Sequence, residues 1–240
     1  MLWLQAIVIN TVLIAGAQRF PLLTPSGWVH AGALGTVLWG CLGWQGWLAV
    51  VMYLAAGSLV TKIGWRDKEK RGLAEARGGR RSPANVWGSA ATGAALALLI
   101  GSGLEPKSLL LVGFSASFAA KLADTFGSEI GKRWGGQPRL ITTLQPVPAG
   151  TEGAISLEGT LASAAGSVLM TLALYSLQLL PSLAISSVVM LIGLLATLAE
   201  SVLGAVAQDR LTWLSNELVN SLQTTLAALL AIAVLSPWMS

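Results

Sequence analysis

Residues 107–126 read KSLLLVGFSASFAAKLADTF, a run of apolar and small residues with its charged side chains toward the two ends. Its length matches the roughly 20 residues that a helix needs to cross the hydrocarbon core of a bilayer. Of the 240 residues in the chain, 54% are hydrophobic and only 11% are charged, against roughly 25% charged in an ordinary soluble domain. The sequence therefore predicts an all-α fold, a polytopic bundle of transmembrane helices in a single integral membrane domain (residues 1–240).

Apolar runs of this kind recur along the chain, at 2–17, 28–42, 45–62, 85–104, 107–126, 155–179, 183–206 and 218–236. The first two runs are short, and the Gly-rich stretch CLGWQGW at 41–47 fits either a loop or a helix. We therefore expect about seven to eight spans, six of which are clear from length alone. Residues 28–46 either cross the bilayer or form a hairpin that lies in its interface. The first run lacks a basic leader and a clear cleavage site, so we interpret it as a retained helix.

The positive charge is concentrated in one segment, because residues 62–84 hold eight of the fifteen Lys and Arg residues. Loops rich in Lys and Arg stay on the cytoplasmic side of a membrane. We expect this basic loop and the Pro/Gly-rich loop 127–154 on that side, which explains the net charge of +4 without a nucleic-acid partner. With one Cys (Cys41) and one His (His30), a disulfide framework and a Cys/His metal cluster are excluded.

Polar side chains gather near the inner ends of the predicted spans, namely Asp124, Glu158, Glu200, Asn220 and Gln223. Helical spacing defines two polar stripes, one formed by Lys121, Asp124 and Ser128 and the other by Asn216, Asn220 and Gln223. Glu129 joins the first stripe only if the helix ends or bends, which Gly127 and Gly131 permit. Each polar residue alone could serve ion pairing or helix association. Their common depth favours a functional site.

The segment 139–163, RLITTLQPVPAGTEGAISLEGTLAS, carries the next polar signal. Prolines and glycines precede a helix that we expect to begin near Gly153 or Ala154. Free backbone amides at a helix N-terminus suit a phosphate group, and Arg139 could add a forked donor. The candidate phosphate-binding residues here are Thr142, Thr143, Gly150, Thr151, Gly153 and Ser156. The alternative is an ordinary Pro-Gly turn with Thr151 as the N-cap.

These residues offer carboxylates for a divalent metal, cations and amides for phosphate groups, and apolar walls for a lipid tail. Hard oxygen ligands suit Mg²⁺. The combination predicts phosphoryl transfer to a lipid at the inner interface, where catalysis is mostly positioning and charge neutralisation. The alternative is a transporter or channel, but transport sites tend to lie near the bilayer midplane between internal repeats. A CDP-alcohol type transferase would need an Asp-rich helical signature, which this sequence lacks.

Five ordered blocks resemble the signature segments of the polytopic membrane proteins that include phytyl-phosphate kinase of vitamin E (tocopherol) synthesis. They are ARGGRRSPANVWGSAATG, LADTFGSEIGKRW, PRLITTLQPVPAGTEGAISLEGTLAS, ESVLGAVAQ and NELVNSLQT. The first looks most like the plant and cyanobacterial branch. The resemblance implies a kinase that converts phytyl phosphate, or geranylgeranyl phosphate, to the diphosphate with CTP as the donor. It also implies a cyanobacterial plasma or thylakoid membrane, with the active site on the cytoplasmic face.

The resemblance also implies roles for individual residues. Asp124 and Glu129 would hold Mg²⁺ on the nucleotide phosphates, with Glu200 as a further ligand. The transferring charge would be neutralised by Lys121, Arg139 and the amides of residues 150–153. Arg80 and Arg81 would act as clamps from the basic loop. Asn216 and Asn220 would position phosphate or metal-bound water.

Tryptophan is abundant near the predicted span ends, at Trp28, Trp44, Trp47, Trp65, Trp87 and Trp238. Trp is enriched at membrane–water interfaces because its ring is apolar and its N–H is polar. We therefore interpret these residues as interfacial anchors rather than as a cage that binds a prenyl chain.

Overall fold

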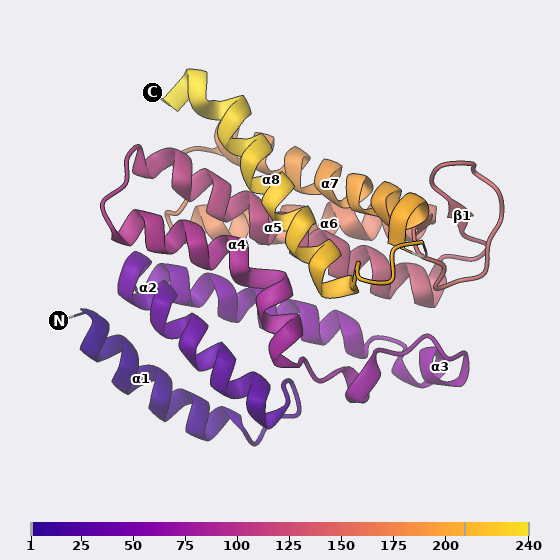
Figure 1. Ribbon diagram of the computed structural model, residues 1–240, viewed down its shortest axis with the longest axis horizontal. Coiled ribbons are helices and arrows are strands. Elements are labelled where there is room, and N and C mark those ends of the chain that lie inside the picture. Colours follow the sequence, from indigo (N-terminus) through magenta and orange to yellow (C-terminus); the bar gives the residue numbers. More distant parts are fainter. Residues whose placement is uncertain (1, 209, 240) are drawn as a thin grey trace.

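The computed structural model describes residues 2–208 and 210–239, which are mostly helical. The long helices are α1 (Leu2–Ala17), α2 (Pro25–Lys62), α4 (Pro83–Gly101), α5 (Lys107–Trp134), α6 (Leu157–Ser176), α7 (Leu183–Leu203) and α8 (Asn216–Met239). The shorter elements are α3 (Trp65–Lys70), the turns η1 (Ala76–Gly79) and η2 (Gly204–Gln208), and the strands β1 (Arg139–Leu140) and β2 (Ala154–Ile155). Most of the long helices run between the same two ends of the molecule (Figure 1).

The helix α2 is broken at Gly43, which has φ 72° and ψ −168°, a combination that essentially only glycine adopts. The chain turns back there, so residues 25–42 and 44–62 run in opposite directions (Figure 1). Trp39 and Trp47 contact each other across the break, with ring centroids 5.5 Å apart. Each half is about 27 Å long at a rise of about 1.5 Å per residue, so residues 28–46 form parts of two long helices rather than a short interfacial hairpin.

The helices have the length and composition of membrane spans. Six of them, α2 and α4 to α8, are long and apolar enough to cross a membrane, and α1 is a shorter apolar helix. With α2 divided at Gly43, the described residues form eight helical segments of 16 residues or more. Large apolar side chains such as Leu195 and Leu229 are exposed on the outside of the bundle, where lipid would surround them. The predicted all-α polytopic bundle is confirmed.

The helix α5 lies at the centre and contacts α2, α4, α6, α7 and α8. Its contact with α6 is close because glycines face each other. A Cβ atom on Gly127 would lie 2.0 Å from the Ser163 Oγ, and one on Gly131 would lie 3.6 Å from the Gly159 Cα. Small residues spaced by four let membrane helices approach each other closely. These glycines serve helix packing and no bend occurs there, since α5 continues unbroken to Trp134.

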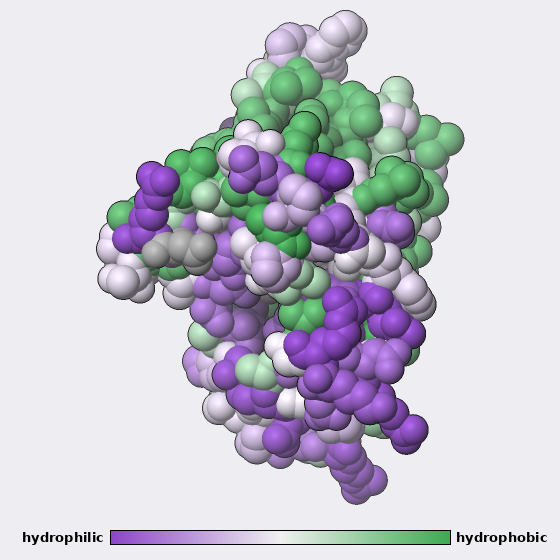
Figure 2. Space-filling view, turned by 90° about the vertical axis from the view of Figure 1, so that its right-hand side faces the viewer, coloured by the Kyte–Doolittle hydropathy of each residue, from purple (hydrophilic) through white to green (hydrophobic). Residues whose placement is uncertain are grey.

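One end of the bundle is polar. We call it the polar end, and it comprises residues 63–82, 135–156 and 204–215 among the described residues. It carries α3 and the two-stranded ladder, while both chain termini lie toward the opposite end (Figure 1). Figure 2 looks onto the polar end and shows hydrophilic side chains gathered there. The two loops that the sequence assigned to one side of the membrane, 62–84 and 127–154, therefore lie at the same end.

Candidate functional site

A cavity of about 300 Å³ lies at the polar end, among α4, α5, α7, α8 and the loop 149–156. Thirteen of the residues that the sequence predicted for the site line this cavity. They are Arg80, Arg81, Lys121, Asp124, Ser128, Glu129, Gly150, Thr151, Gly153, Ser156, Glu200, Asn216 and Asn220. Segments far apart in the sequence thus converge on one hollow.

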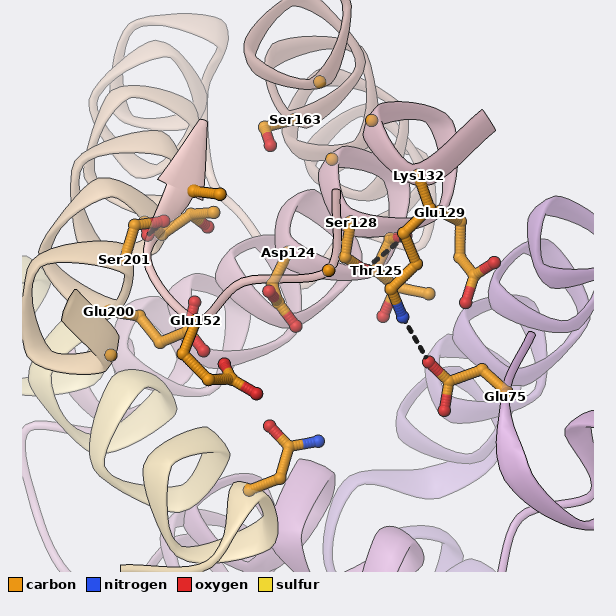
Figure 3. A pocket seen from close by; sticks show the side chains of 18 of the residues that line it. Glu75, Asp124, Thr125, Ser128, Glu129, Lys132, Glu152, Ser163, Glu200 and Ser201 are labelled. Atoms are coloured by element: carbon orange, nitrogen blue, oxygen red, sulfur yellow. Dashed lines mark hydrogen bonds and ion pairs between the residues drawn. The ribbon is translucent and has the colours of Figure 1, made fainter. Parts of the chain in front are cut away.

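Carboxylates from three elements surround this hollow. Asp124 comes from α5, Glu200 from α7 and Glu152 from the loop before β2, and Figure 3 shows them around the same space. Beside them lies Lys121, which is only 4% exposed. Its ammonium group pairs with Asp124 and donates to the Asn220 Oδ1 at 2.7 Å. The two polar stripes predicted on α5 and α8 therefore meet at Lys121.

Glu129 lines the cavity wall but is directed to another partner. Its carboxylate pairs with Lys68 of α3, whose ammonium also donates to the Thr61 carbonyl oxygen at 2.9 Å. Because Lys68 is fully buried and Glu129 is 3% exposed, this pair fastens the basic loop to α5.

A metal site formed by the three predicted carboxylates is not assembled. Among the described residues, no three Asp, Glu, His or Cys side chains are grouped to hold a metal ion. Mg²⁺ bound to a nucleotide usually needs only one or two protein carboxylates, since phosphate oxygens and waters complete its shell. Asp124 and Glu200, which face the same hollow, fit that smaller requirement.

Three predicted residues, Arg139, Thr142 and Thr143, do not line the cavity. The Arg139 guanidinium donates to the Leu144 carbonyl oxygen at 2.8 Å, within its own loop. Its backbone pairs with Ile155 in the ladder of β1 and β2. The part of the loop that precedes and includes β2 lines the cavity instead.

The start of α6 differs from the prediction. The helix begins at Leu157 and its N-cap is Ser156, whose Oγ accepts the Gly159 N–H at 3.1 Å. The expected start near Gly153 or Ala154 is therefore wrong, and so is the alternative N-cap Thr151. Thr151 instead donates through its Oγ1 to the Pro148 carbonyl oxygen.

The loop before α6 lies tightly against the end of α7. Gly150 and Gly153 have φ of 88° and 74°, values that favour glycine. A Cβ atom on Gly153 would lie 2.5 Å from the Ala205 backbone nitrogen. Ala205 belongs to η2, a π-helical turn, and such turns are frequent at functional sites.

Sequence reasoning missed an ion pair in the cavity lining. The Lys132 Nζ lies 2.7 Å from the Glu75 Oε1, and both residues line the cavity. Burial raises the pKa of the Glu75 carboxyl, but the Lys132 ammonium outweighs this and holds the pKa below the ordinary 4.5. Extending the stripe of Lys121, Asp124 and Ser128 by four residues would have found Lys132. The sequence offers no comparable signal for Glu75.

Comparisons with known proteins give a consistent result. The chain matches the family described as Integral membrane protein DUF92 over residues 8–228. It is 48% identical over 237 residues to an uncharacterised membrane protein of Synechocystis sp., covering 97% of this chain and 91% of that protein.

More distant relatives also match. Protein VTE6, chloroplastic, of Arabidopsis thaliana is 41% identical over 217 residues, which are 88% of this chain and 64% of that protein. An uncharacterised membrane protein of Methanocaldococcus jannaschii is 29% identical over 229 residues, covering 95% of this chain and 92% of that protein. No solved structure shows a significant match.

Proposed function

Since the chain belongs to the DUF92 family of integral membrane proteins, we propose that it is a membrane kinase that phosphorylates a prenyl phosphate. The reaction transfers the γ-phosphoryl group of a nucleoside triphosphate, CTP in the first instance, to phytyl phosphate or geranylgeranyl phosphate. The product is a prenyl diphosphate for tocopherol or phylloquinone synthesis, as in chlorophyll salvage. The 41% identity to VTE6 and the resemblance of five sequence blocks to phytyl-phosphate kinases support this proposal.

One structural observation carries the proposal. Carboxylates, cations and a glycine-containing loop line one cavity at the end of membrane-spanning helices. A phosphorylated lipid in a bilayer presents its head group at this depth, and a nucleotide reaches it from the aqueous side. The transporter alternative has no such support, because the cavity lies at one end of the bundle rather than midway.

Charge neutralisation is the main task of these residues. Lys121 and Arg80 would neutralise phosphate charge, and the loop amides of residues 150–153 would bind phosphate oxygens. Asp124 and Glu200 would hold Mg²⁺, which lowers the repulsion between the nucleotide and its acceptor. The acceptor oxygen is already anionic near neutral pH, so no general base is needed and in-line positioning decides the rate.

The polar end would face the cytoplasm, because it carries the basic loop 62–84. In a cyanobacterial cell the protein would lie in the plasma or thylakoid membrane. There both substrates are available at the same surface, the nucleotide from solution and the lipid from the bilayer.

The test is a transfer assay with purified protein in lipid nanodiscs, Mg²⁺, γ-labelled CTP and phytyl phosphate. We expect label in prenyl diphosphate after thin-layer separation. ATP, GTP and UTP in parallel reactions define the donor. Label that stays in the aqueous phase with all four nucleotides, in well-folded protein, would contradict the proposal.

A further inference from the structure

A second cavity, of about 570 Å³, lies among α1, α2 and α4. We call it the apolar groove, and its lining includes Ile14, Trp28, Trp47, Leu54, Val86 and Ala90. Its volume falls within the range of about 300–1,000 Å³ that is usual for small-molecule sites. Two of the tryptophans that the sequence suggested as interfacial anchors, Trp28 and Trp47, line this cavity. Trp28 is only 6% exposed.

The apolar groove meets the polar cavity. Arg81, Asn85 and Ser89 line both of them. Among the described residues that line the groove, Arg81 alone is charged. The two cavities therefore form neighbouring compartments, one polar and one apolar, with a guanidinium group at their boundary.

Arg81 is held firmly in this position. Its guanidinium donates to the Tyr53 hydroxyl at 2.8 Å and lies over the Tyr53 ring. A Cβ atom on Gly57 would lie 2.6 Å from an Arg81 nitrogen, so Gly57 leaves the space that the guanidinium fills. The Arg81 backbone N–H donates to the Leu22 carbonyl oxygen at 3.0 Å, which ties it to the connection between α1 and α2.

We propose that the apolar groove binds the prenyl tail of the lipid acceptor and that Arg81 binds its phosphate. This inference rests on the proposed kinase function and adds the place of the acceptor. A prenyl phosphate has an apolar chain joined to an anionic head, which matches an apolar groove with a single guanidinium at its polar edge. A planar guanidinium is well suited to phosphate.

The assignment changes the role of Arg81 from a clamp on the nucleotide to a binding residue for the acceptor. The acceptor phosphate would approach from the Arg81 side of the polar cavity. Its oxygen then attacks the γ-phosphorus of the donor, the bond to the bridging oxygen breaks, and the nucleoside diphosphate leaves. Asp124 and Glu200 remain available to the donor.

The first test needs no activity. Wild-type protein in nanodiscs is photolabelled with a geranylgeranyl phosphate that carries a diazirine on its chain, and the labelled peptides are sequenced. We expect label on α1, α2 and α4 that excess geranylgeranyl phosphate prevents and geranylgeraniol prevents poorly. Label confined to other helices, or unaffected by the phosphate, would overturn the inference.

The second test uses matched variants. Ala55, which is exposed and lines the groove, is replaced in Ala55→Phe, and Ala15, which is exposed outside the groove, in Ala15→Phe. We expect Ala55→Phe to raise the KM for geranylgeranyl phosphate about tenfold or more, with little change for isopentenyl phosphate. Ala15→Phe should match the wild type. Equal KM values for geranylgeranyl phosphate in Ala55→Phe and Ala15→Phe would contradict the binding of the prenyl tail in the groove.

Arg81→Lys separates the two substrates. This substitution keeps the positive charge but removes the paired N–H donors of the guanidinium. We therefore expect the KM for the lipid acceptor to rise about tenfold, while the KM for the nucleotide stays constant. A rise in the KM for the nucleotide alone would show that Arg81 binds the phosphate donor, and would contradict the inference. Specific photolabelling of the groove without phosphoryl transfer by the wild type would reject the kinase and retain the lipid site. Phosphoryl transfer by the wild type with photolabelling outside the groove would retain the kinase function and reject the lipid site in the groove.

Discussion

Lys121 is an ammonium group held inside a membrane protein, 4% exposed, by one carboxylate and one amide. Such a buried cation is unfavourable unless it is paired. Its pairing with Asp124 is compatible with two roles for the aspartate, a structural counter-ion or a carboxylate of the reaction site. Asp124 retains 18% side-chain exposure toward the cavity, which favours the second role.

The substitution Asp124→Asn distinguishes these roles, since it keeps the size and removes the charge. We expect kcat for phosphoryl transfer, measured per folded molecule, to fall about 100-fold or more. The melting temperature in nanodiscs should also fall, because Lys121 loses its charged partner and keeps the Asn220 amide oxygen as an acceptor. Glu158→Gln is the matched control. Glu158 is exposed on the first turn of α6 and does not line the cavity. Loss of folded protein in proportion to activity would assign Asp124 to structure.

Glu75 gives a prediction about pH. The Lys132 ammonium holds the pKa of Glu75 below its ordinary 4.5. A lowered carboxyl pKa stabilises the folded state above the ordinary value, and this stabilisation is lost as pH falls through the lowered pKa. We expect the wild type to melt above Glu75→Gln at pH 7, with the difference in melting temperature shrinking as the pH is lowered below 4.5. A difference that grows as the pH falls would contradict this ion pair.

At the scale of elements, the contact between α5 and α6 depends on Gly127. A Cβ atom there would lie 2.0 Å from the Ser163 Oγ, so Gly127→Ala should destabilise the protein by about 1–3 kcal/mol. Ser163→Ala removes that oxygen. The double variant should therefore recover part of the loss, which a double-mutant cycle of thermal unfolding measures. Strictly additive effects would show that the two residues do not meet.

Sequence patterns predicted the helices well because a membrane requires runs of a known length. They also predicted the polar stripes of α5 and α8, because the residues of each stripe recur with helical spacing, and the structure brings the two stripes together at Lys121 and Asn220. They failed where a contact depends on a partner far along the chain. The family resemblance suggested Glu129 as a metal ligand, and nothing in the local sequence indicates that its partner is Lys68. Arg139 was predicted as a phosphate ligand, but it lies in a loop. A loop has no repeating sequence pattern that indicates which way a side chain points.

For the whole molecule, the arrangement of ends predicts a labelling pattern. Lys70 ends α3 at the polar end, and Lys107 begins α5 at the opposite end (Figure 1); both side chains are exposed. In a Cys41→Ala background, Lys70→Cys and Lys107→Cys should react with a membrane-impermeant maleimide from opposite sides of sealed vesicles. Labelling of both from one side would contradict the orientation of α4 between them.

The reversal at Gly43 decides the direction in which α1 crosses the membrane relative to the later helices. As one straight helix, the 38 residues of α2 would be about 57 Å long, nearly double the thickness of the hydrocarbon layer. The turn at Gly43 divides them into two helices that run in opposite directions. Because of this return, α1 begins and α8 ends toward the side opposite the polar cavity (Figure 1). A bulkier residue at position 43 that straightened α2 would reverse the direction of α1 across the bilayer, while the later helices kept their directions.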